Sequence, residues 1–435
     1  MGYCLSSHSK IEGSPVNTDH FAIERVVGVG GFGKVNCVTK LYGADSKTHY
    51  AMKTLWKKEA FKTKSSEDML FNEREILEKL HHPRLVNMLY AFQDPYRCYL
   101  VLDLALGGDL AYQQRQQPGG IFEENQAIFY IGQLFEALEY MHSLNILHRD
   151  VKPDNLVLEA SGHIKLTDFG ISKYLDKQRR CTARSGTGAY MAPEIKGKGS
   201  HGIAADLYAM GITLFVFLTG YLPIPRPDMS TRKKRRNSRI GRAGIASLEE
   251  SKADSKSQAP ENHNMEFSTT AEIIQHGIEE LESAGRYSEA CLDFLKCVTV
   301  ENENDRLQIR HLEPATEENT SGKTTEHEKH LLEIGRGSVV GHGNISTDVG
   351  VHDRIRQHRW FVSTSGGYLD SLRQMKIDPP FLPDTTKANC DTGHTDATDT
   401  LLGEGLLVEP NIAPAQAKRL ETYDYNISPI EPSLE

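Results

Sequence analysis

The sequence has 435 residues, with 50 Lys and Arg against 59 Asp and Glu, and its formal net charge is −9. That length allows about two to four compact domains, or one large bilobal domain with extensions. The mildly acidic total argues against a dedicated nucleic-acid-binding protein, because such proteins carry a strongly basic domain. The seven cysteines are scattered and form no Cys-x-x-Cys pair. Neither a disulfide framework nor a zinc site is predicted, and a reducing compartment is expected.

The N-terminus lacks the apolar core of a signal peptide, but it fits an acylation pattern. The start Met1-Gly2-x-x-x-Ser6 matches the N-myristoylation motif, in which Gly2 is exposed once the methionine is removed. Cys4 is placed to accept a second acyl chain, and a second signal matters because one myristoyl chain binds membranes only marginally. A chance match of a Met-Gly start with a nearby serine is the alternative.

Strand-like and helical patterns alternate from Phe21 to about Pro225. Short runs rich in β-branched residues predict strands at 22–27, 35–39, 50–54, 98–102, 156–158 and 163–166. Helices are predicted at 66–80, 125–144, 270–281 and 287–298 from charge and apolar spacing. The apolar run Leu207 to Leu218 is too short for a membrane span and is predicted to be a buried core helix.

Two polar stretches interrupt this pattern. Residues 226–268 contain the basic run Arg232 to Arg236 and few apolar residues, and residues 311–350 are rich in Glu, Thr, Gly and His. Such compositions cannot bury enough apolar surface to become ordered, so both stretches are predicted to be disordered insertions. The basic run is a candidate nuclear signal or anionic-lipid patch, with a solvated charge run as the alternative.

A glycine-rich segment, Gly28 to Val35, lies between two predicted strands. Glycine lets backbone N–H groups approach phosphate oxygens because no Cβ intervenes. A dinucleotide-binding fingerprint would open a helix, whereas this chain continues as a strand, as in the phosphate clamp of protein kinases. Lys53 in the next strand and Glu73 on the following helix predict an ion pair that fixes a phosphate-binding lysine. A solvent-facing lysine at a sheet edge is the alternative.

The segment from His148 to Asn155 places a base, a cation and an amide close together after a helix. Asp168-Phe169-Gly170 and Ala192-Pro193-Glu194 follow it in order. The whole set, in this strand and helix context, resembles eukaryotic protein kinases. The resemblance implies an α+β, bilobal protein-kinase fold, with a small β-rich N-lobe, a larger and mainly helical C-lobe and an AGC-like C-terminal tail.

The resemblance also implies roles for individual residues. Asp150, Lys152 and Asn155 would be catalytic: Asp150 accepts or orients the proton of the substrate hydroxyl, and Lys152 neutralises charge on the transferred phosphoryl group. Asn155 and Asp168 would hold Mg2+, with Mn2+ as an alternative ion. The residues implied to bind ATP are Val27, Gly28, Val29, Gly30, Gly31, Phe32, Gly33, Lys34, Val35, Ala51, Lys53, Glu73, Leu102, Asp103, Ala105 and Asp109. Among them Leu102 would be the gatekeeper, and Asp103 to Ala105 the hinge that bonds adenine.

Other stretches are similar to the AGC group of serine/threonine kinases and, within it, to the YANK family. They are Asn72–Leu77, His82–Asn87, Phe92–Asp94, Leu106–Leu110, His358–Phe361, Pro379–Pro383 and Asn389–Asp391, together with the Met-Gly start. Gly186–Tyr190 departs from the Gly-Thr-Pro-Glu-Tyr usual in that group. The resemblance further implies that Asp206 braces the catalytic loop and that Arg306 pairs with Glu194.

Regulation and substrate recognition follow from the same resemblance. Arg149 would pair with an activation-segment phosphate, and nearby basic residues would form a cradle for it: Lys173, Lys177, Arg179, Arg180 and Arg184. Thr182 and Ser185 are the candidate phosphosites, although Ala183 stands where most AGC kinases have threonine, and constitutive activity is the alternative. Asp109 and Asp154 would read arginines before the phosphosite, and Thr187 would contact Asp150 and Lys152. Ser238, in an arginine-rich sequence, is a candidate autophosphorylation site.

The predicted organisation has three parts. Residues 1–20 form a flexible, acylated N-terminus, and residues 21–361 form a kinase domain with its N-lobe at about 21–104 and its C-lobe at about 105–361. Residues 362–435 form a partly disordered tail.

The expected partners are Ser/Thr-containing protein substrates, with no nucleic acid and a monomer as the default. The expected location is the cytoplasm, or the cytoplasmic face of a membrane. A pseudokinase scaffold and a small-molecule phosphotransferase are the rival functions.

Overall fold

The computed structural model describes residues 15–30, 33–197, 199–225, 269–307, 350–362, 367–383 and 412–426. The acylation motif and the insertion 226–268 lie outside these ranges. So does the second predicted insertion, except for its last residue, Gly350.

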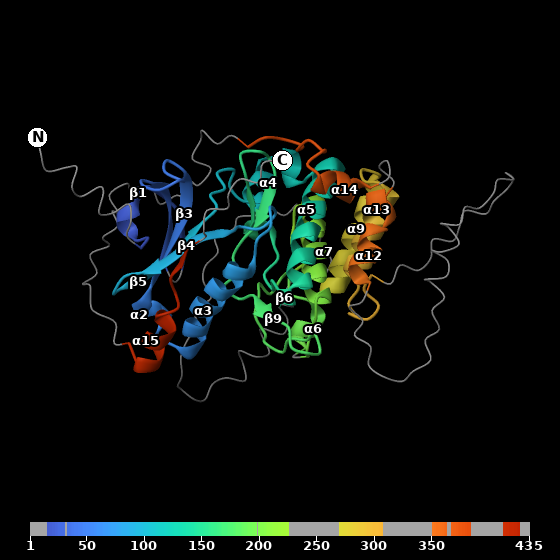
Figure 1. The fold of residues 1–435 in the computed structure, drawn as a ribbon. Coiled ribbons are helices and arrows are strands. Elements are labelled where there is room, and N and C mark those ends of the chain that lie inside the picture. Colours follow the sequence, from blue (N-terminus) through green and yellow to red (C-terminus); the bar gives the residue numbers. More distant parts are fainter. Residues whose placement is uncertain are drawn as a thin grey trace, which may run out of the picture.

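An antiparallel sheet forms the smaller lobe, on the left of Figure 1, with strand order β1-β2-β3-β5-β4-β10. Its strands are β1 (Phe21–Gly30), β2 (Gly33–Lys40), β3 (His49–Trp56), β4 (Met88–Gln93), β5 (Arg97–Leu102) and β10 (Tyr425–Asn426). Val35 pairs with Lys53, and Ala51 with Leu102, so their side chains share one face of the sheet. The opposite face carries a separate apolar cluster that includes Val38 and Met52.

One long helix packs against this sheet. Helix α2 (Lys57–Ala60) leads into α3 (Lys64–Lys79), which begins where the Thr63 side chain accepts a hydrogen bond from the Ser66 N–H at 3.1 Å. The predicted helix at 66–80 is therefore confirmed, with its start two residues earlier. Leu70 and Ile76 enter the core beneath the sheet, while charged residues cover the outer side.

The larger lobe is mainly helical. Its helices are α4 (Leu110–Gln116), α5 (Glu124–Ser143), α6 (Pro193–Lys196), α7 (Ala204–Thr219), α9 (Thr270–Ala284), α10 (Glu289–Val298), α12 (Val351–Arg356), α13 (Arg359–Val362) and α14 (Tyr368–Arg373). Two small antiparallel sheets of two strands each complete it: β6 (Ile146–Leu147) with β9 (Lys173–Tyr174), and the hairpin of β7 (Leu156–Leu158) with β8 (Ile164–Leu166). Short 3-10 turns occupy Thr18–His20, Pro118–Gly120 and Pro153–Asn155.

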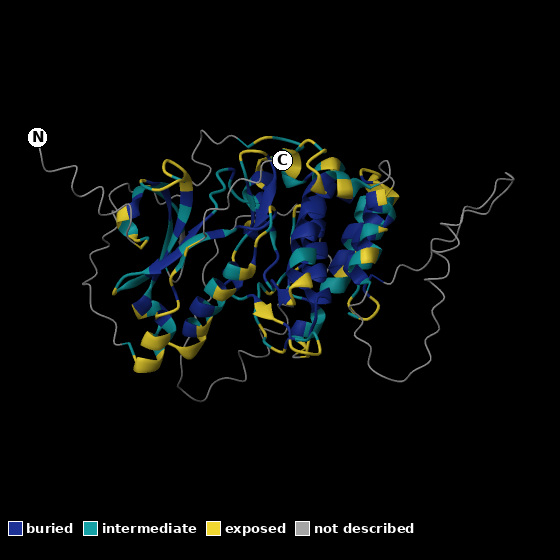
Figure 2. Ribbon diagram, viewed as in Figure 1, coloured by how far each residue is buried: buried dark blue, intermediate teal, exposed yellow. Residues whose placement is uncertain are grey.

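Helix α7 is buried along almost its whole length (Figure 2), as predicted for the apolar run in its sequence. Gly211 lies so close to α10 that a Cβ there would come within 2.7 Å of the Val298 side chain, so glycine permits this close packing. Within the described ranges, no helix combines the length and apolar character that crossing a bilayer requires.

The end of the described chain returns to the smaller lobe. Helix α15 (Pro414–Leu420) lies beside α3, and β10 extends the sheet along β4 (Figure 1). Arg419 donates to the Glu67 carboxylate at 2.5 Å and lies over the Phe71 ring. Tyr423 is fully buried against α3, and Arg74 donates to its carbonyl at 3.0 Å. The sequence did not predict this segment, because its few apolar residues do not establish a periodicity.

Tyr423→Ala should detach this segment, because truncating a buried aromatic side chain costs about 3–5 kcal/mol. Hydrogen exchange of residues 412–426 and of α3 should then increase. Tyr423→Phe should leave exchange nearly unchanged, because the buried ring is kept and only the hydroxyl beside the Cys98 thiol is lost. The exposed Glu421→Ala is the control. Unchanged protection in Tyr423→Ala would show that the side chain does not hold the segment.

Candidate active site

The predicted lysine–carboxylate pair is formed. Lys53 on β3 donates to Glu73 Oε1 on α3 at 2.6 Å. Burial alone would lower the pKa of Lys53, but the charges of Glu73 and Asp168 outweigh it and raise that pKa. The ammonium group therefore stays charged, and its long side chain is fixed in one position between two carboxylates.

Asp150 lies at the centre of a compact set of donors. Its carboxylate accepts hydrogen bonds from Lys152 Nζ at 2.7 Å, from Thr187 Oγ1 at 2.6 Å and from the Thr187 N–H at 2.9 Å. Burial would raise the pKa of Asp150, yet the bonds from Lys152 and Thr187 lower it overall. The group is an anion at neutral pH, as a proton acceptor or orienting group must be. The contacts implied for Thr187 are present.

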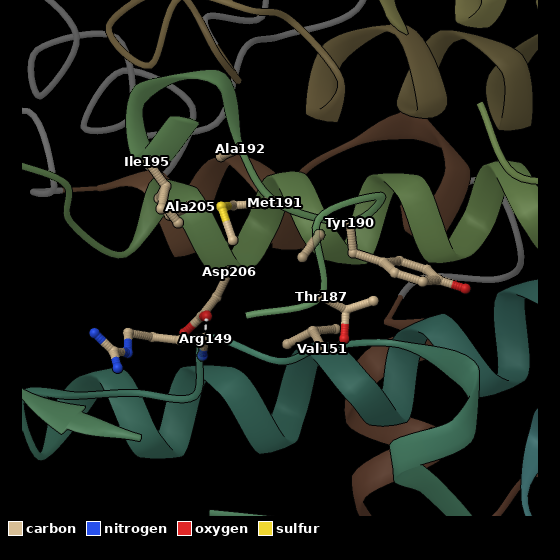
Figure 3. Close-up of a pocket in the computed structure, with 10 residues that line it drawn as sticks. Arg149, Val151, Thr187, Tyr190, Met191, Ala192, Ile195, Ala205 and Asp206 are labelled. Carbon is tan, nitrogen blue, oxygen red and sulfur yellow. Dashed lines mark hydrogen bonds between the residues drawn. The ribbon is translucent and has the colours of Figure 1, made fainter. Parts of the chain in front are cut away.

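A buried carboxylate holds the backbone of the catalytic loop. Asp206 on α7 accepts hydrogen bonds from the N–H groups of His148 at 2.9 Å and Arg149 at 2.8 Å, and from His142 Nε2 at 2.9 Å. Figure 3 shows the carboxylate directed at the Arg149 backbone nitrogen. Arg149 has a φ of +70°, a conformation that costs a non-glycine residue about 1–2 kcal/mol. Asp206 thus fixes a strained backbone next to Asp150, as its implied bracing role requires.

The implied metal ligands offer suitable oxygen atoms. The Asn155 amide nitrogen donates to the Asp150 carbonyl at 2.7 Å and to its carboxylate at 3.0 Å, so the amide oxygen is the atom left for an ion. The Asp168 carboxylate lies near the charge of Lys53. The backbone φ of Asp168 is +67°. The next residue, Phe169, is buried. An amide oxygen and a carboxylate are hard oxygen ligands, which is the chemistry that Mg2+ prefers.

The connection between the lobes is held by its own set of contacts. Leu102, the predicted gatekeeper, is buried opposite Ala51. The Asp103 carboxylate accepts from Asn87 Nδ2 at 2.8 Å and from Lys165 Nζ at 3.0 Å, and the Asp103 N–H donates to the Asn87 carbonyl. Neither the Asp103 carbonyl nor the Ala105 N–H bonds another described backbone group, so both are able to bond an adenine edge, as the resemblance implies for this hinge. Sequence reasoning missed Asn87 and Lys165, which no motif connects to the hinge.

The glycine-rich loop is described only in part. Val27, Gly28 and the segment from Gly33 to Val35 lie within β1 and β2, whereas the predicted ATP contacts Gly31 and Phe32 lie outside the described residues. A Cβ at Gly33 would fall 1.7 Å from the Thr54 carbonyl oxygen, so only glycine lets β2 pass this close to β3. The described residues on both sides of the loop form strands, as the sequence predicted, and Gly33 begins a strand and not a helix.

Two acidic side chains meet at the edge of this site. Asp109 accepts from the Tyr112 N–H at 2.6 Å and caps α4. Burial raises the pKa of Asp109, and the neighbouring charge of Asp154 adds to the increase. Asp154 itself is exposed. Together they place two neighbouring carboxylates at this edge, and the charges of Asp154 and Asp150 both act on Tyr190.

The activation segment is anchored through Arg149, without any phosphate. Arg149 donates from Nε to the Ile171 carbonyl at 2.8 Å and from Nη1 to the Ala183 carbonyl at 2.7 Å. Thr182 is exposed and Ser185 is half-buried. Thr182 lies one position before Ala183, whose carbonyl Arg149 contacts, and Ser185 lies two positions after it.

The basic cradle predicted from the sequence is already partly occupied by protein groups. Arg179 donates to Asn145 Oδ1 at 2.7 Å, and Arg180 pairs with Glu303 at 2.6 Å. These two arginines brace the segment against the larger lobe, so the cradle has fewer uncommitted cations than the sequence indicated.

Two further contacts connect the site to its surroundings. Arg306 forms a double hydrogen bond with Glu194, at 2.8 and 3.1 Å, as the resemblance implies. Asn72 on α3 donates to the Ser172 carbonyl at 2.7 Å and joins that helix to the segment after Asp168. Sequence reasoning did not assign this role to Asn72.

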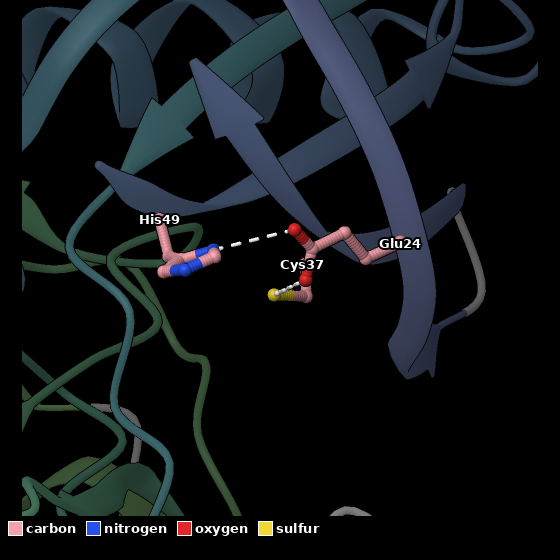
Figure 4. A group of neighbouring side chains, drawn as sticks. All are labelled: Glu24, Cys37 and His49. Carbon is pink, nitrogen blue, oxygen red and sulfur yellow. Dashed lines mark hydrogen bonds and ion pairs between the residues drawn. The ribbon is translucent and has the colours of Figure 1, made fainter. Parts of the chain in front are cut away.

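Two other groups of side chains with metal-ligand chemistry occur among the described residues. The first comprises Glu24, Cys37 and His49 on adjacent strands (Figure 4). Glu24 lies 3.8 Å from the Cys37 sulfur and 3.4 Å from His49 Nδ1, and that nitrogen also lies 2.9 Å from Thr39 Oγ1. These hydrogen bonds account for the arrangement without an ion.

The second group comprises Asp293, Cys297 and His358. The Trp360 N–H donates to His358 Nδ1 at 3.2 Å, so in a neutral ring the proton must lie on Nε2. Nε2 is the atom that faces Asp293, at 3.3 Å, and a protonated nitrogen cannot bind a metal. The ion pair of Asp293 with Arg359 at 3.1 Å and the hydrogen bonds of His358 account for this group without a metal.

The family model for the protein kinase domain matches residues 21–315. The chain belongs to the protein kinase family. The predicted bilobal α+β fold is thereby confirmed. A human relative, ribosomal protein S6 kinase alpha-3, is 39% identical over 225 residues, which are 52% of this chain and 30% of the relative. The Xenopus laevis ribosomal protein S6 kinase 2 beta is 39% identical over 225 residues, again 52% of this chain and 35% of the relative.

A plant relative gives a similar match. The Arabidopsis thaliana serine/threonine-protein kinase AtPK1/AtPK6 is 42% identical over 209 residues, which are 48% of this kinase and 43% of the relative. In all three comparisons this kinase covers less than half of the relative's length. The matches support a serine/threonine protein kinase of AGC type.

Asp206→Asn should destabilise this kinase by about 3–5 kcal/mol near neutral pH, because an amide cannot accept all three hydrogen bonds at this buried position. Burial would raise the pKa of Asp206, but the His142 bond and neighbouring groups lower it below 3.8. Its stabilising effect is therefore full above about pH 4 and is lost as pH falls through the lowered folded-state pKa.

Urea unfolding at several pH values checks this expectation. The Asn variant should show a smaller loss of unfolding free energy on acidification below pH 4 than the wild type. The exposed Asp378→Asn should behave like the wild type throughout. Equal stability of Asp206→Asn and wild type at pH 7 would refute the bracing role.

Proposed function

We propose that this chain is an ATP-dependent serine/threonine protein kinase that transfers the ATP γ-phosphate to serine or threonine hydroxyls of protein substrates. The observation that carries the proposal is the assembly around Asp150, where Lys152 and Thr187 contact its carboxylate and Asn155 contacts its backbone and carboxylate oxygens. Lys152, two positions after Asp150 and bonded to Thr187 at 2.8 Å, is the arrangement of serine/threonine kinases in the resemblance described above.

The residues have separable tasks in this mechanism. Asp150 orients the incoming hydroxyl and takes up its proton, and Lys152 balances negative charge at the same point. Lys53, fixed by Glu73, binds phosphate oxygens, and Asn155 and Asp168 would hold Mg2+. ATP with Mg2+ supplies the phosphoryl group that is transferred. Mg2+ also neutralises the negative charge that the transition state spreads over the phosphoryl oxygens. Most of the catalysis is therefore positioning by these side chains.

A pseudokinase scaffold is not favoured, because such proteins typically lack the lysine, the catalytic aspartate or the metal-binding aspartate. Here Lys53, Asp150 and Asp168 are all present, and Lys53 already pairs with Glu73. A small-molecule phosphotransferase would not require the activation segment that Arg149 anchors, or the contact between Arg306 and Glu194.

Asp168→Ala should abolish activity, with a decrease of at least about a hundredfold, because one of the two metal ligands is removed. The assay measures phosphate incorporation into an arginine-rich serine peptide with ATP and Mg2+. The exposed Asp370→Asn serves as the control. Equal incorporation by wild type and Asp168→Ala would refute catalysis by this site.

We also propose a preference for arginine-rich sequences, supported by the adjacent carboxylates of Asp109 and Asp154. Asp154→Asn should reduce the ratio of kcat/KM for an arginine-containing peptide to that for its alanine counterpart by about tenfold, as expected for a lost charge-assisted contact. The ratio should also fall with increasing salt. The same ratio in wild type and Asp154→Asn would show that Asp154 does not recognise arginine in the substrate.

Gly2, Cys4 and Ser238 lie outside the described residues. We propose membership of the YANK family, N-myristoylation at Gly2 with acylation of Cys4, and a resulting location at the cytoplasmic face of a membrane. Autophosphorylation at Ser238 is proposed from its arginine-rich surroundings. Intact-mass and peptide mass spectrometry of the protein from eukaryotic cells measures all three modifications; an unmodified Gly2, Cys4 or Ser238 would contradict the respective proposal.

A further inference from the structure

One cysteine in the activation segment lies in an environment unlike that of the other described cysteines. Cys181 is 6% exposed and packs against Leu147 and Ile203. Its backbone forms a two-way hydrogen-bonded bridge with His201, with distances of 2.8 and 2.9 Å. The sulfur accepts a hydrogen bond from Arg149 Nη1 at 3.6 Å. A thiol, a guanidinium and an imidazole therefore meet directly beside the catalytic loop.

The imidazole at this point lacks an explanation in the fold. His201 is 1% exposed, and neither ring nitrogen finds a hydrogen-bond partner of standard geometry among the described residues. Burying a polar ring without partners is costly. A neighbouring thiol that can transfer its proton to the ring gives His201 a role, because the resulting thiolate and imidazolium attract each other.

The electrostatics favour the same arrangement. Burial would raise the pKa of the Cys181 thiol, but His201, the Ala183 backbone N–H and the charge of Arg149 lower it to about 7. Burial instead raises the thiol pKa of Cys98 to about 12 and that of Cys297 to about 11. The nearby Arg180 does not add to this effect, because Glu303 pairs with it. Cys181 thus differs in thiolate character from two other described cysteines.

We propose that Cys181 is a redox modification site, at which a thiolate held by Arg149 and His201 reacts reversibly with peroxides and thereby lowers kinase activity. The effect on activity rests on the proposed function; the modification itself does not. Arg149 uses the same Nη1 atom to hold the Ala183 carbonyl at 2.7 Å. An oxygen atom added to the sulfur enlarges the group at this contact and shifts the arginine that anchors the activation segment.

The chemical step is a two-electron oxidation. The Cys181 sulfur attacks one oxygen of hydrogen peroxide, the O–O bond breaks, and the sulfur becomes a sulfenic acid. The hydroxide that leaves takes the proton held by His201 and becomes water. Sulfur loses two electrons and the peroxide gains them, and a thiol reductant reverses the change.

The first experiment measures the reactivity of each cysteine in the full chain. Iodoacetamide alkylation over a pH range, followed by peptide mass spectrometry, should give a midpoint near pH 7 for Cys181. At pH 7 its rate should exceed that of Cys297 at least about tenfold, although Cys297 is more exposed. His201→Gln should slow alkylation of Cys181 and raise its midpoint, and leave Cys297 unchanged. Faster alkylation of Cys297, or no effect of His201→Gln, would overturn the proposal.

The second experiment concerns the consequence. Hydrogen peroxide followed by a sulfenic-acid-trapping dione should label Cys181 and reduce kinase activity severalfold, and a thiol reductant should restore both. Cys181→Ser should remain active and resist peroxide, whereas Cys297→Ser should stay as sensitive as the wild type. Activity loss without labelling at Cys181, or labelling without activity loss, would refute the regulatory role. An inactive wild-type chain with a reactive Cys181 would instead contradict only the proposed function.

Discussion

The active site depends on a buried carboxylate that never contacts the reacting groups. Asp206 accepts hydrogen bonds from the N–H groups of His148 and Arg149. These bonds stabilise a backbone turn with a positive φ at Arg149. The two side chains at that turn both reach the activation segment: Asp150 contacts Thr187, and Arg149 contacts the Ala183 carbonyl. One charge in the core of the larger lobe therefore sets both the position of the Asp150 carboxylate and the anchorage of the activation segment.

A second constraint comes from α3, which joins three parts of the chain. Glu73 on this helix fixes Lys53, Asn72 bonds the segment after Asp168, and the opposite side of the helix receives α15 through Glu67. A rigid helix transmits displacement along its length, so these contacts cannot vary independently. The ion pair of Lys53 is thus supported from the distal end of the sequence, with Tyr423 buried as the anchor.

Much of this could be predicted from the sequence, because local patterns carry it. The glycine-rich turn, the Asp150 segment and the apolar α7 run are each contiguous, so spacing alone indicates their structure. Contacts between residues far apart in the sequence could not be predicted from spacing. The resemblance supplied Asp206 and the pairing of Arg306 with Glu194, whereas the bonds from Lys165 to the hinge and the pairing of Cys181 with His201 follow only from the folded chain.

The strand at the end of the described chain has a further consequence for solubility. A sheet edge with unpaired N–H and C=O groups is a template on which another polypeptide can add, and β4 would present such an edge beyond β5. In this protein Tyr425 and Asn426 pair with Ala91 and Tyr90 and occupy that edge. The tail thereby covers β4 at two positions and leaves a two-residue strand at that edge, which offers little backbone for strand addition.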